Sequence, residues 1–176
     1  PEPMRFNAWQ EADFDGDGVV DIVASVGGGK DNGFWTRDNW SRDGKWLRSE
    51  GNGYIYVMKG LGGEGSDARF APPEMLKLKD GSPLWARCIT STLIHDWDGD
   101  GDLDLIVYDF TDNITYFENT GTRTKPVYEQ GRLLKDAQGE RLHGELCLPS
   151  AIATDWDGDG KTDMLFTEED ARVGWF

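Results

Sequence analysis

The chain has 176 residues, and its 33 acidic and 18 basic side chains leave a formal charge of −15. Nucleic acids and anionic membrane surfaces would repel such a chain, so neither is an expected partner. The length allows one domain with a real core, and no apolar run approaches the ~20 residues that span a bilayer, so no membrane insertion is expected. Its 23 glycines, 12% aromatic content and short apolar runs between Gly- and Asp-rich turns predict an all-β protein.

A nine-residue acidic motif occurs three times along the chain. The copies are DFDGDGVVD from Asp13 to Asp21, DWDGDGDLD from Asp96 to Asp104, and DWDGDGKTD from Asp155 to Asp163. The second and third copies begin 59 residues apart, and the first begins 83 residues before the second. A recurrence of this kind indicates a repeat architecture.

Strand-like segments follow each motif in the same order, which divides the chain into three units. The first unit, about residues 5–86, continues with IVASV and YIYVMKG. The second, about residues 87–145, predicts four strands, in CITSTLIH, LDLIVYDF, NITYFEN and KPVYEQGRLL, with the motif as the first turn. The third, about residues 146–176, contains MLFT and RVGWF and stops at the third strand.

Four antiparallel strands make one blade of a β-propeller, so the pattern predicts two complete blades and a partial third within one domain over residues 1–176. A closed propeller has ~4–8 blades. We therefore expect further blades from the same polypeptide or from another chain, because open sheet surfaces are usually covered.

The spacing of the aspartates predicts a cation site in each loop, because alternate positions of a tight turn can direct carboxylates at one centre that offsets their repulsion. The expected ligands are the side chains at positions one, three, five and nine and the carbonyl at position seven. They are Asp13, Asp15, Asp17, Val19 and Asp21; Asp96, Asp98, Asp100, Asp102 and Asp104; and Asp155, Asp157, Asp159, Lys161 and Asp163. Position seven varies, so only its backbone should matter, and the Asp102 side chain is expected outside the cage. Carboxylate-rich oxygen coordination suits Ca²⁺ better than Mg²⁺.

Two other interpretations of the loop are less favoured. An EF-hand needs a bidentate Glu at loop position 12 and flanking helices, whereas this chain has Ala24, Val107 and Phe166 there, followed by β-branched and aromatic residues. A dockerin-type loop fails at the same position. An ordinary acidic surface turn would explain one copy, but not three copies in register.

The DxDGDGxxD loop before an apolar strand, with YFENTGTRTKPVY downstream, resembles the FG-GAP/VCBS-type repeats of calcium-binding β-propellers. The resemblance covers nearly the whole chain. It implies the propeller fold and about three Ca²⁺ ions, but no single activity. The letters FG and GAP are missing, which favours bacterial secreted modules over integrin-like adhesion. Extracellular calcium modules have Kd values of roughly 10⁻⁴–10⁻³ M, so we expect an extracellular, cell-surface or periplasmic location.

One segment, residues 27–53, interrupts the first unit between its second and third strands and does not repeat. It is the most basic and most aromatic part of an acidic chain, and it should lie at the blade edge opposite the acidic loops. Aromatic rings suit sugar faces, and arginines suit uronate or sulfate groups, so an anionic glycan is the preferred ligand class. The candidate ligand-binding residues are Trp35, Arg37, Trp40, Arg42 and Trp46. An equally good interpretation is that the tryptophans form a small core under a long loop.

Three functions follow from these observations. The first is a calcium-stabilised propeller segment that recognises carbohydrate. The second is part of a polysaccharide lyase, in which His143 would be the base and Arg87 would neutralise the uronate, although a surface histidine is the simpler interpretation of His143. The third is a structural scaffold or a subunit that assembles with other copies. Cys88 and Cys147 occupy equivalent positions in two units and are expected to be free thiols.

Overall fold

The computed structural model describes residues 6–27, 42, 52–87, 90–109, 113–142, 150–167 and 173–175. These residues form antiparallel β-sheets, which confirms the predicted all-β class. A single 3₁₀ turn, Gly65–Asp67, is the helical element of the described part of the chain. None of its helices has the length and apolarity that crossing a membrane requires.

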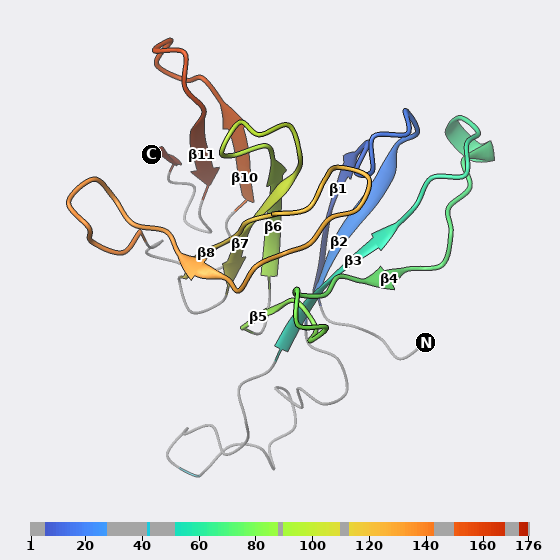
Figure 1. Ribbon diagram of the computed structural model, residues 1–176, viewed down its shortest axis with the longest axis horizontal. Helices are drawn as coiled ribbons and strands as arrows, with labels where there is room; N and C mark the ends of the chain where they lie inside the picture. The colour runs from blue at the N-terminus through green and yellow to red at the C-terminus, as the bar shows by residue number, and fades with distance from the viewer. Residues whose placement is uncertain are drawn as a thin grey trace.

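Three sheets follow one another along the chain (Figure 1). The first consists of β1 (Phe6–Ala12), β2 (Asp21–Gly27), β3 (Asn52–Met58), β4 (Glu74–Met75) and β5 (Trp85–Arg87). The second consists of β6 (Thr90–His95), β7 (Asp104–Asp109), β8 (Ile114–Phe117) and β9 (Arg132–Leu133). The third consists of β10 (Ser150–Thr154), β11 (Asp163–Thr167) and β12 (Val173–Trp175).

The second sheet has the predicted four-stranded meander, in the order β6-β7-β8-β9. Its last strand is much shorter than the segment KPVYEQGRLL suggested. Tyr128 forms isolated bridges to Leu78 and Asn119 instead, so this segment crosses from one sheet to the next before β9 begins. Within the described residues, the three sheets form no closed barrel or ring.

The first and second sheets pack face to face. Val23, Ile55 and Val57 of the first sheet share a buried cluster with Leu105 and Val107 of the second. The hydroxyls of Ser25 and Thr92 meet across this interface at 2.5 Å. Alternate residues of β2 are buried, which is the pattern of a strand with one covered face.

The opposite face of the second sheet packs on the third. Ile106, Tyr108 and Tyr116 lie in a second buried cluster with Met164 and Phe166. Because both faces of the middle sheet are covered, all six residues of β7 are buried, and the segment LIVY is continuously apolar rather than alternating.

The three acidic loops connect β1 to β2, β6 to β7 and β10 to β11, and all lie at the upper edge of the molecule in Figure 1. The opposite end of the first sheet is marked by Gly27, which pairs with Gly53, while Ile22 next to the loop pairs with Met58. The described end of β2 at Gly27 and the described start of β3 at Asn52 therefore both lie at the end of the sheet away from the acidic loop.

Candidate metal centres

Each acidic loop brings three carboxylates together. One oxygen from each member of a group lies within 4.8 Å of the others. Within the described residues, the groups are Asp13, Asp15 and Asp17; Asp96, Asp98 and Asp104; and Asp155, Asp157 and Asp163. Each group could hold a metal ion, and every member is a residue that the sequence assigned to a cation site.

Two hydrogen bonds from a backbone amide to an aspartate side chain recur in all three loops. The amide at position six donates to the aspartate at position one, from Gly18 to Asp13 (3.2 Å), Gly101 to Asp96 (3.0 Å) and Gly160 to Asp155 (3.1 Å). The amide at position seven donates to the aspartate at position five, at 2.7, 3.0 and 2.8 Å. The glycines at position six have φ values of 86°, 96° and 85°, a backbone conformation that favours glycine. The motif therefore encodes one loop geometry three times.

The aspartate that closes each loop also joins it to the sheet. The amide of the second loop residue donates to this carboxylate, from Phe14 to Asp21 (2.8 Å), Trp97 to Asp104 (3.1 Å) and Trp156 to Asp163 (2.8 Å). Beyond the third strand, the amides of Gly60 and Asn119 donate to Asp21 (2.7 Å) and Asp104 (2.8 Å). The closing aspartate thus connects the loop to the turn that follows the neighbouring strand.

The position-nine carboxylates consequently have a second role that sequence reasoning missed. Asp104 also accepts a hydrogen bond from the Tyr116 hydroxyl at 2.9 Å, and burial together with this bond raises the pKa of Tyr116. In the first loop both oxygens of Asp21 accept amides, and Asp17 rather than Asp21 completes the carboxylate group. Gly60 and Asn119 each follow the third strand of their sheet by two residues. This shared position is the feature of the sequence from which the second role of the closing aspartate could have been predicted.

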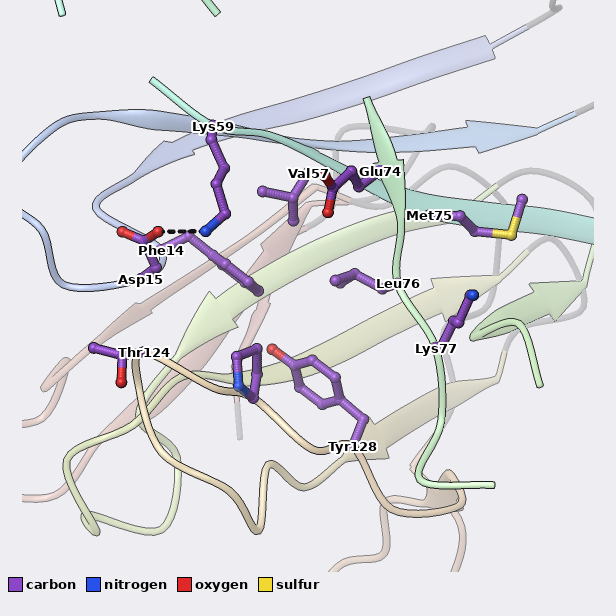
Figure 2. Close-up of a pocket in the computed structure, with 11 residues that line it drawn as sticks. Phe14, Asp15, Val57, Lys59, Glu74, Met75, Leu76, Lys77, Thr124 and Tyr128 are labelled. Carbon is purple, nitrogen blue, oxygen red and sulfur yellow. Dashed lines mark hydrogen bonds and ion pairs between the residues drawn. The ribbon is translucent and has the colours of Figure 1, made fainter. Parts of the chain in front are cut away.

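The first loop contains two buried carboxylate oxygens that accept no hydrogen bond. Oδ1 of Asp13 and Oδ1 of Asp15 are buried and have no hydrogen-bond partner. The other oxygen of Asp15 is 2.7 Å from Nζ of Lys59, which lowers the pKa of Asp15 and raises that of Lys59. Figure 2 shows this pair at one end of a groove of about 660 Å³ that Tyr128 also lines. Unsatisfied buried oxygens are costly, and a bound cation would satisfy them.

A residue of the connection between β8 and β9 also reaches into the first loop. Arg123 donates from Nη2 to the carbonyl oxygen of Asp13 at 2.6 Å. Its Cγ lies 3.1 Å from the point where a Cβ on Gly16 would sit, so the arginine stem packs directly on the loop. The sequence TGTRTKP was noted as part of the repeat, but the contact across 110 residues could be seen only in the structure.

The second loop concentrates the most buried charge. Asp102 is 5% exposed, and its Oδ1 is buried without a hydrogen-bond partner. Burial, with the neighbouring charges of Asp100 and Asp104, raises the pKa of Asp102 to about 6. Burial likewise raises the pKa of Asp98. Asp102 is not in the group of three converging carboxylates, in line with its predicted place outside the cage, but its burial was not expected from the variable position seven.

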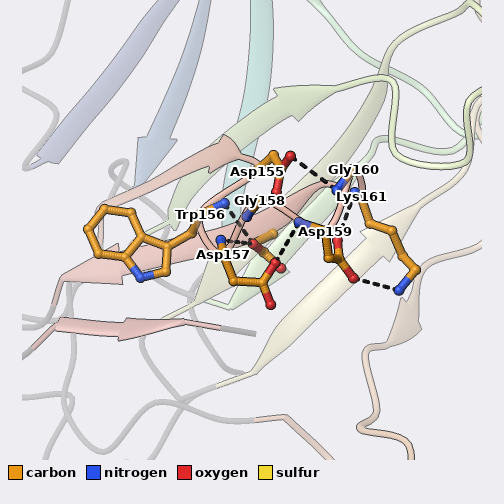
Figure 3. A network of polar contacts seen from close by, with 8 residues as sticks. Asp155, Trp156, Asp157, Gly158, Asp159, Gly160 and Lys161 are labelled. Carbon is orange, nitrogen blue, oxygen red and sulfur yellow. Dashed lines mark hydrogen bonds and ion pairs between the residues drawn. The ribbon is translucent and has the colours of Figure 1, made fainter.

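The third loop is the most exposed of the three. Asp155 and Asp157 are exposed, and Asp163 is partly buried. Figure 3 shows the Nζ of Lys161 pointing at Asp159 Oδ2, 2.7 Å away, and this contact lowers the pKa of Asp159. The expected role of Lys161 was limited to its carbonyl, whereas its side chain pairs with one carboxylate of its own loop.

Most of the predicted ligand-binding and catalytic candidates lie outside the described residues. These are Trp35, Arg37, Trp40, Trp46 and His143, and the predicted free thiols Cys88 and Cys147 lie outside the described residues as well. Arg42 is an exposed turn residue, and Arg87 is exposed on β5. Among the described residues, nine of the predicted aspartate ligands therefore converge in three groups, whereas Asp21, Asp100 and Asp159 lie outside these groups. The glycan-binding assignment stays a prediction.

Comparisons with protein family models, with curated proteins and with solved structures found no match to this chain.

Proposed function

We propose that this chain is a calcium-stabilised β-propeller segment of the FG-GAP/VCBS type, in which each of the three sheets is one blade. The observation that carries the proposal is the threefold recurrence of one loop. Each copy lies at the same turn of its sheet, shares the hydrogen bond from the position-six amide to the first aspartate, and gathers three carboxylates.

Calcium fits these loops better than other cations. The described groups consist of aspartate alone, without the histidine or cysteine ligands that zinc and other transition metals prefer. Ca²⁺ accepts ~6–8 oxygens in flexible geometry, whereas Mg²⁺ demands a tight octahedron and keeps its waters. Three ions would also bring the formal charge of the chain from −15 to −9.

The role of the ions is structural. The buried oxygens of Asp13 and Asp15 have no hydrogen-bond partner, so a cation would add favourable contacts available only in the folded chain. A ligand that binds only the folded state stabilises it by RT ln(1 + [L]/Kd). Extracellular calcium is near the Kd expected for such modules, which supports a site of action outside the cytoplasm.

The biological role that we assign is recognition of carbohydrate by residues 27–53. This rests on the tryptophans and arginines of that segment, and on its attachment to the sheet end away from the calcium loops. Separating the ions from the binding surface would let calcium stabilise the blades without touching the ligand.

The decisive experiment measures thermal unfolding of the chelated protein during titration with CaCl₂ and, in parallel, MgCl₂. We expect a calcium-dependent rise in Tm, little response to magnesium, and about three bound Ca²⁺ ions by calorimetry. A melting temperature that does not respond to calcium would refute the structural role. The carbohydrate assignment is tested separately by glycan-array binding of the chain and of a Trp35→Ala/Trp40→Ala variant, and no binding to any acidic glycan would refute it.

A further inference from the structure

Within the part of the chain that the structure describes, the two outermost sheets each leave one apolar face uncovered. On the first sheet the side chains form a shallow depression of about 480 Å³. It is lined by Trp9, Ile22, Ala24, Val26, Tyr56, Met58 and Pro73. On the third sheet the uncovered face carries Ile152, Leu165 and Trp175, which are direct cross-strand neighbours. Trp9, Ile152 and Trp175 are 60%, 58% and 52% exposed, which is unusual for side chains of this size.

The register of the strands shows what kind of surface each face is. Counting from the closing aspartate of the loop, positions one and three of β7 are Leu105 and Val107, which pack on the preceding sheet. Positions two and four are Ile106 and Tyr108, which pack on the following sheet. The middle sheet therefore uses one set of positions for each neighbour.

The first and third sheets use the same strand positions as the middle sheet to contact their neighbours. In β11, positions one and three are Met164 and Phe166, and they pack on the preceding sheet. In β2, position two is Val23, which packs on the following sheet together with Val57, its cross-strand partner on β3, and Ile55 of the same strand. Each interface in the molecule thus joins positions two and four of one sheet to positions one and three of the next.

The uncovered faces are the two missing halves of such an interface. The first sheet exposes its positions one and three, Ile22 and Ala24, which would receive a preceding sheet. The third sheet presents position two, Leu165, flanked by Ile152 and Trp175, which would receive a following sheet. One chain therefore carries both partners of a further sheet-to-sheet contact, at opposite ends of its stack.

We propose that two copies of this chain associate head to tail, with the outer face of the β10–β12 sheet of one copy packed on the outer face of the β1–β4 sheet of the other. The occupant is a second copy because the contact continues the two interfaces already present within the chain. Two such contacts close a ring of six sheets, within the ~4–8 blades of closed propellers. The contact uses no residue of the acidic loops, so it stands independently of calcium binding.

The mass in solution tests the proposal, measured by sedimentation velocity and light scattering between roughly 1 and 100 µM, a range that covers weak interfaces of ordinary size. We expect a dimer of the 176-residue chain. Trp9→Asp and Trp175→Asp should each give a monomer, because each variant removes one half of every contact. Leu133→Asp, at an exposed position on β9 of the middle sheet, is the matched control and should remain a dimer.

Mixing the two tryptophan variants distinguishes a head-to-tail contact from a symmetric one. The intact third sheet of the Trp9→Asp copy can still pack on the intact first sheet of the Trp175→Asp copy, so an equimolar mixture should recover a dimer. Cooperative melting of each variant alone confirms that it is folded. A monomeric parent chain at about 100 µM, a Trp9→Asp or Trp175→Asp chain that still dimerises, or a mixture that stays monomeric would each overturn the proposal. If the parent chain is monomeric, the apolar faces of the first and third sheets are covered by sheets other than those of a second copy.

Discussion

Lys59 Nζ lies 2.7 Å from Asp15 Oδ2, so a cation from the end of the third strand already contacts a carboxylate of the first acidic loop. The second loop has a different arrangement, because the residue that corresponds to Lys59, one place after its third strand, is the acidic Glu118. The three loops therefore share a backbone design but differ in the positive charge that surrounds them. Those differences make the loops separately testable.

Replacing Lys59 with methionine should raise the calcium affinity of the first loop. The substitution keeps most of the apolar stem while removing a charge that competes with calcium for Asp15. Because Lys59 is half exposed, the pair contributes no more than about 1 kcal/mol, and an affinity gain of a few-fold is expected. Calorimetric titration measures it. Lys79→Met, which removes a lysine paired with Glu129, is the control and should leave all sites unchanged.

Replacing Arg123 with methionine should loosen the contact between the first loop and the second sheet. The guanidinium donates to the Asp13 carbonyl, and charged hydrogen bonds of this kind contribute about 1.5–3 kcal/mol when well formed. A lower free energy of unfolding in urea is expected with calcium present. Lys125→Met removes one positive charge from the same turn and should have little effect. Equal stability of the Arg123 variant and the parent would show that the arginine does not connect the sheets.

Asp98 and Asp104 should respond in opposite ways to substitution by asparagine in the chelated protein. Asp104 accepts bonds from Trp97, Asn119 and Tyr116, so Asp104→Asn should lower stability by about 2–3 kcal/mol even without metal. Burial raises the pKa of Asp98, so Asp98→Asn should stabilise the chelated protein slightly and weaken calcium binding. Urea unfolding with and without calcium measures both. Matching losses in the two variants would contradict the separate roles.

The chelated protein should lose stability as the pH rises from about 4 to about 6.5. Asp102 has a pKa raised to about 6, so the folded state holds its proton longer than the unfolded state does, and this contribution favours folding only at low pH. The effect is on the order of 3 kcal/mol, because each pKa unit corresponds to about 1.4 kcal/mol. Calcium should reverse the trend, because binding requires ionised carboxylates. Unfolding curves across pH check it, and Asp102→Asn should flatten the chelated profile.

The strand pattern and the loops were predictable because both are local. The alternation along DIVASVG and the repeated DxDGDGxxD place strands and turns through nearby backbone and side-chain preferences, and the structure has β2, β7 and β11 beginning at the closing aspartate in each copy. The short β9 was not predictable in the same way. Tyr128 and its neighbours have strand-like composition, yet they bridge Leu78 and Asn119 between two sheets.

The sequence by itself determined the all-β class, the three acidic loops and the aspartates in them, because a short motif contains everything that its own turn requires. The tertiary structure alone decided which carboxylates converge, that Asp102 is buried, that Lys59 and Arg123 reach the first loop, and which faces of the outer sheets stay uncovered. These features depend on how sheets stack across tens of residues. Packing between distant segments sets the burial and the charge environment of each loop, and no local pattern encodes it.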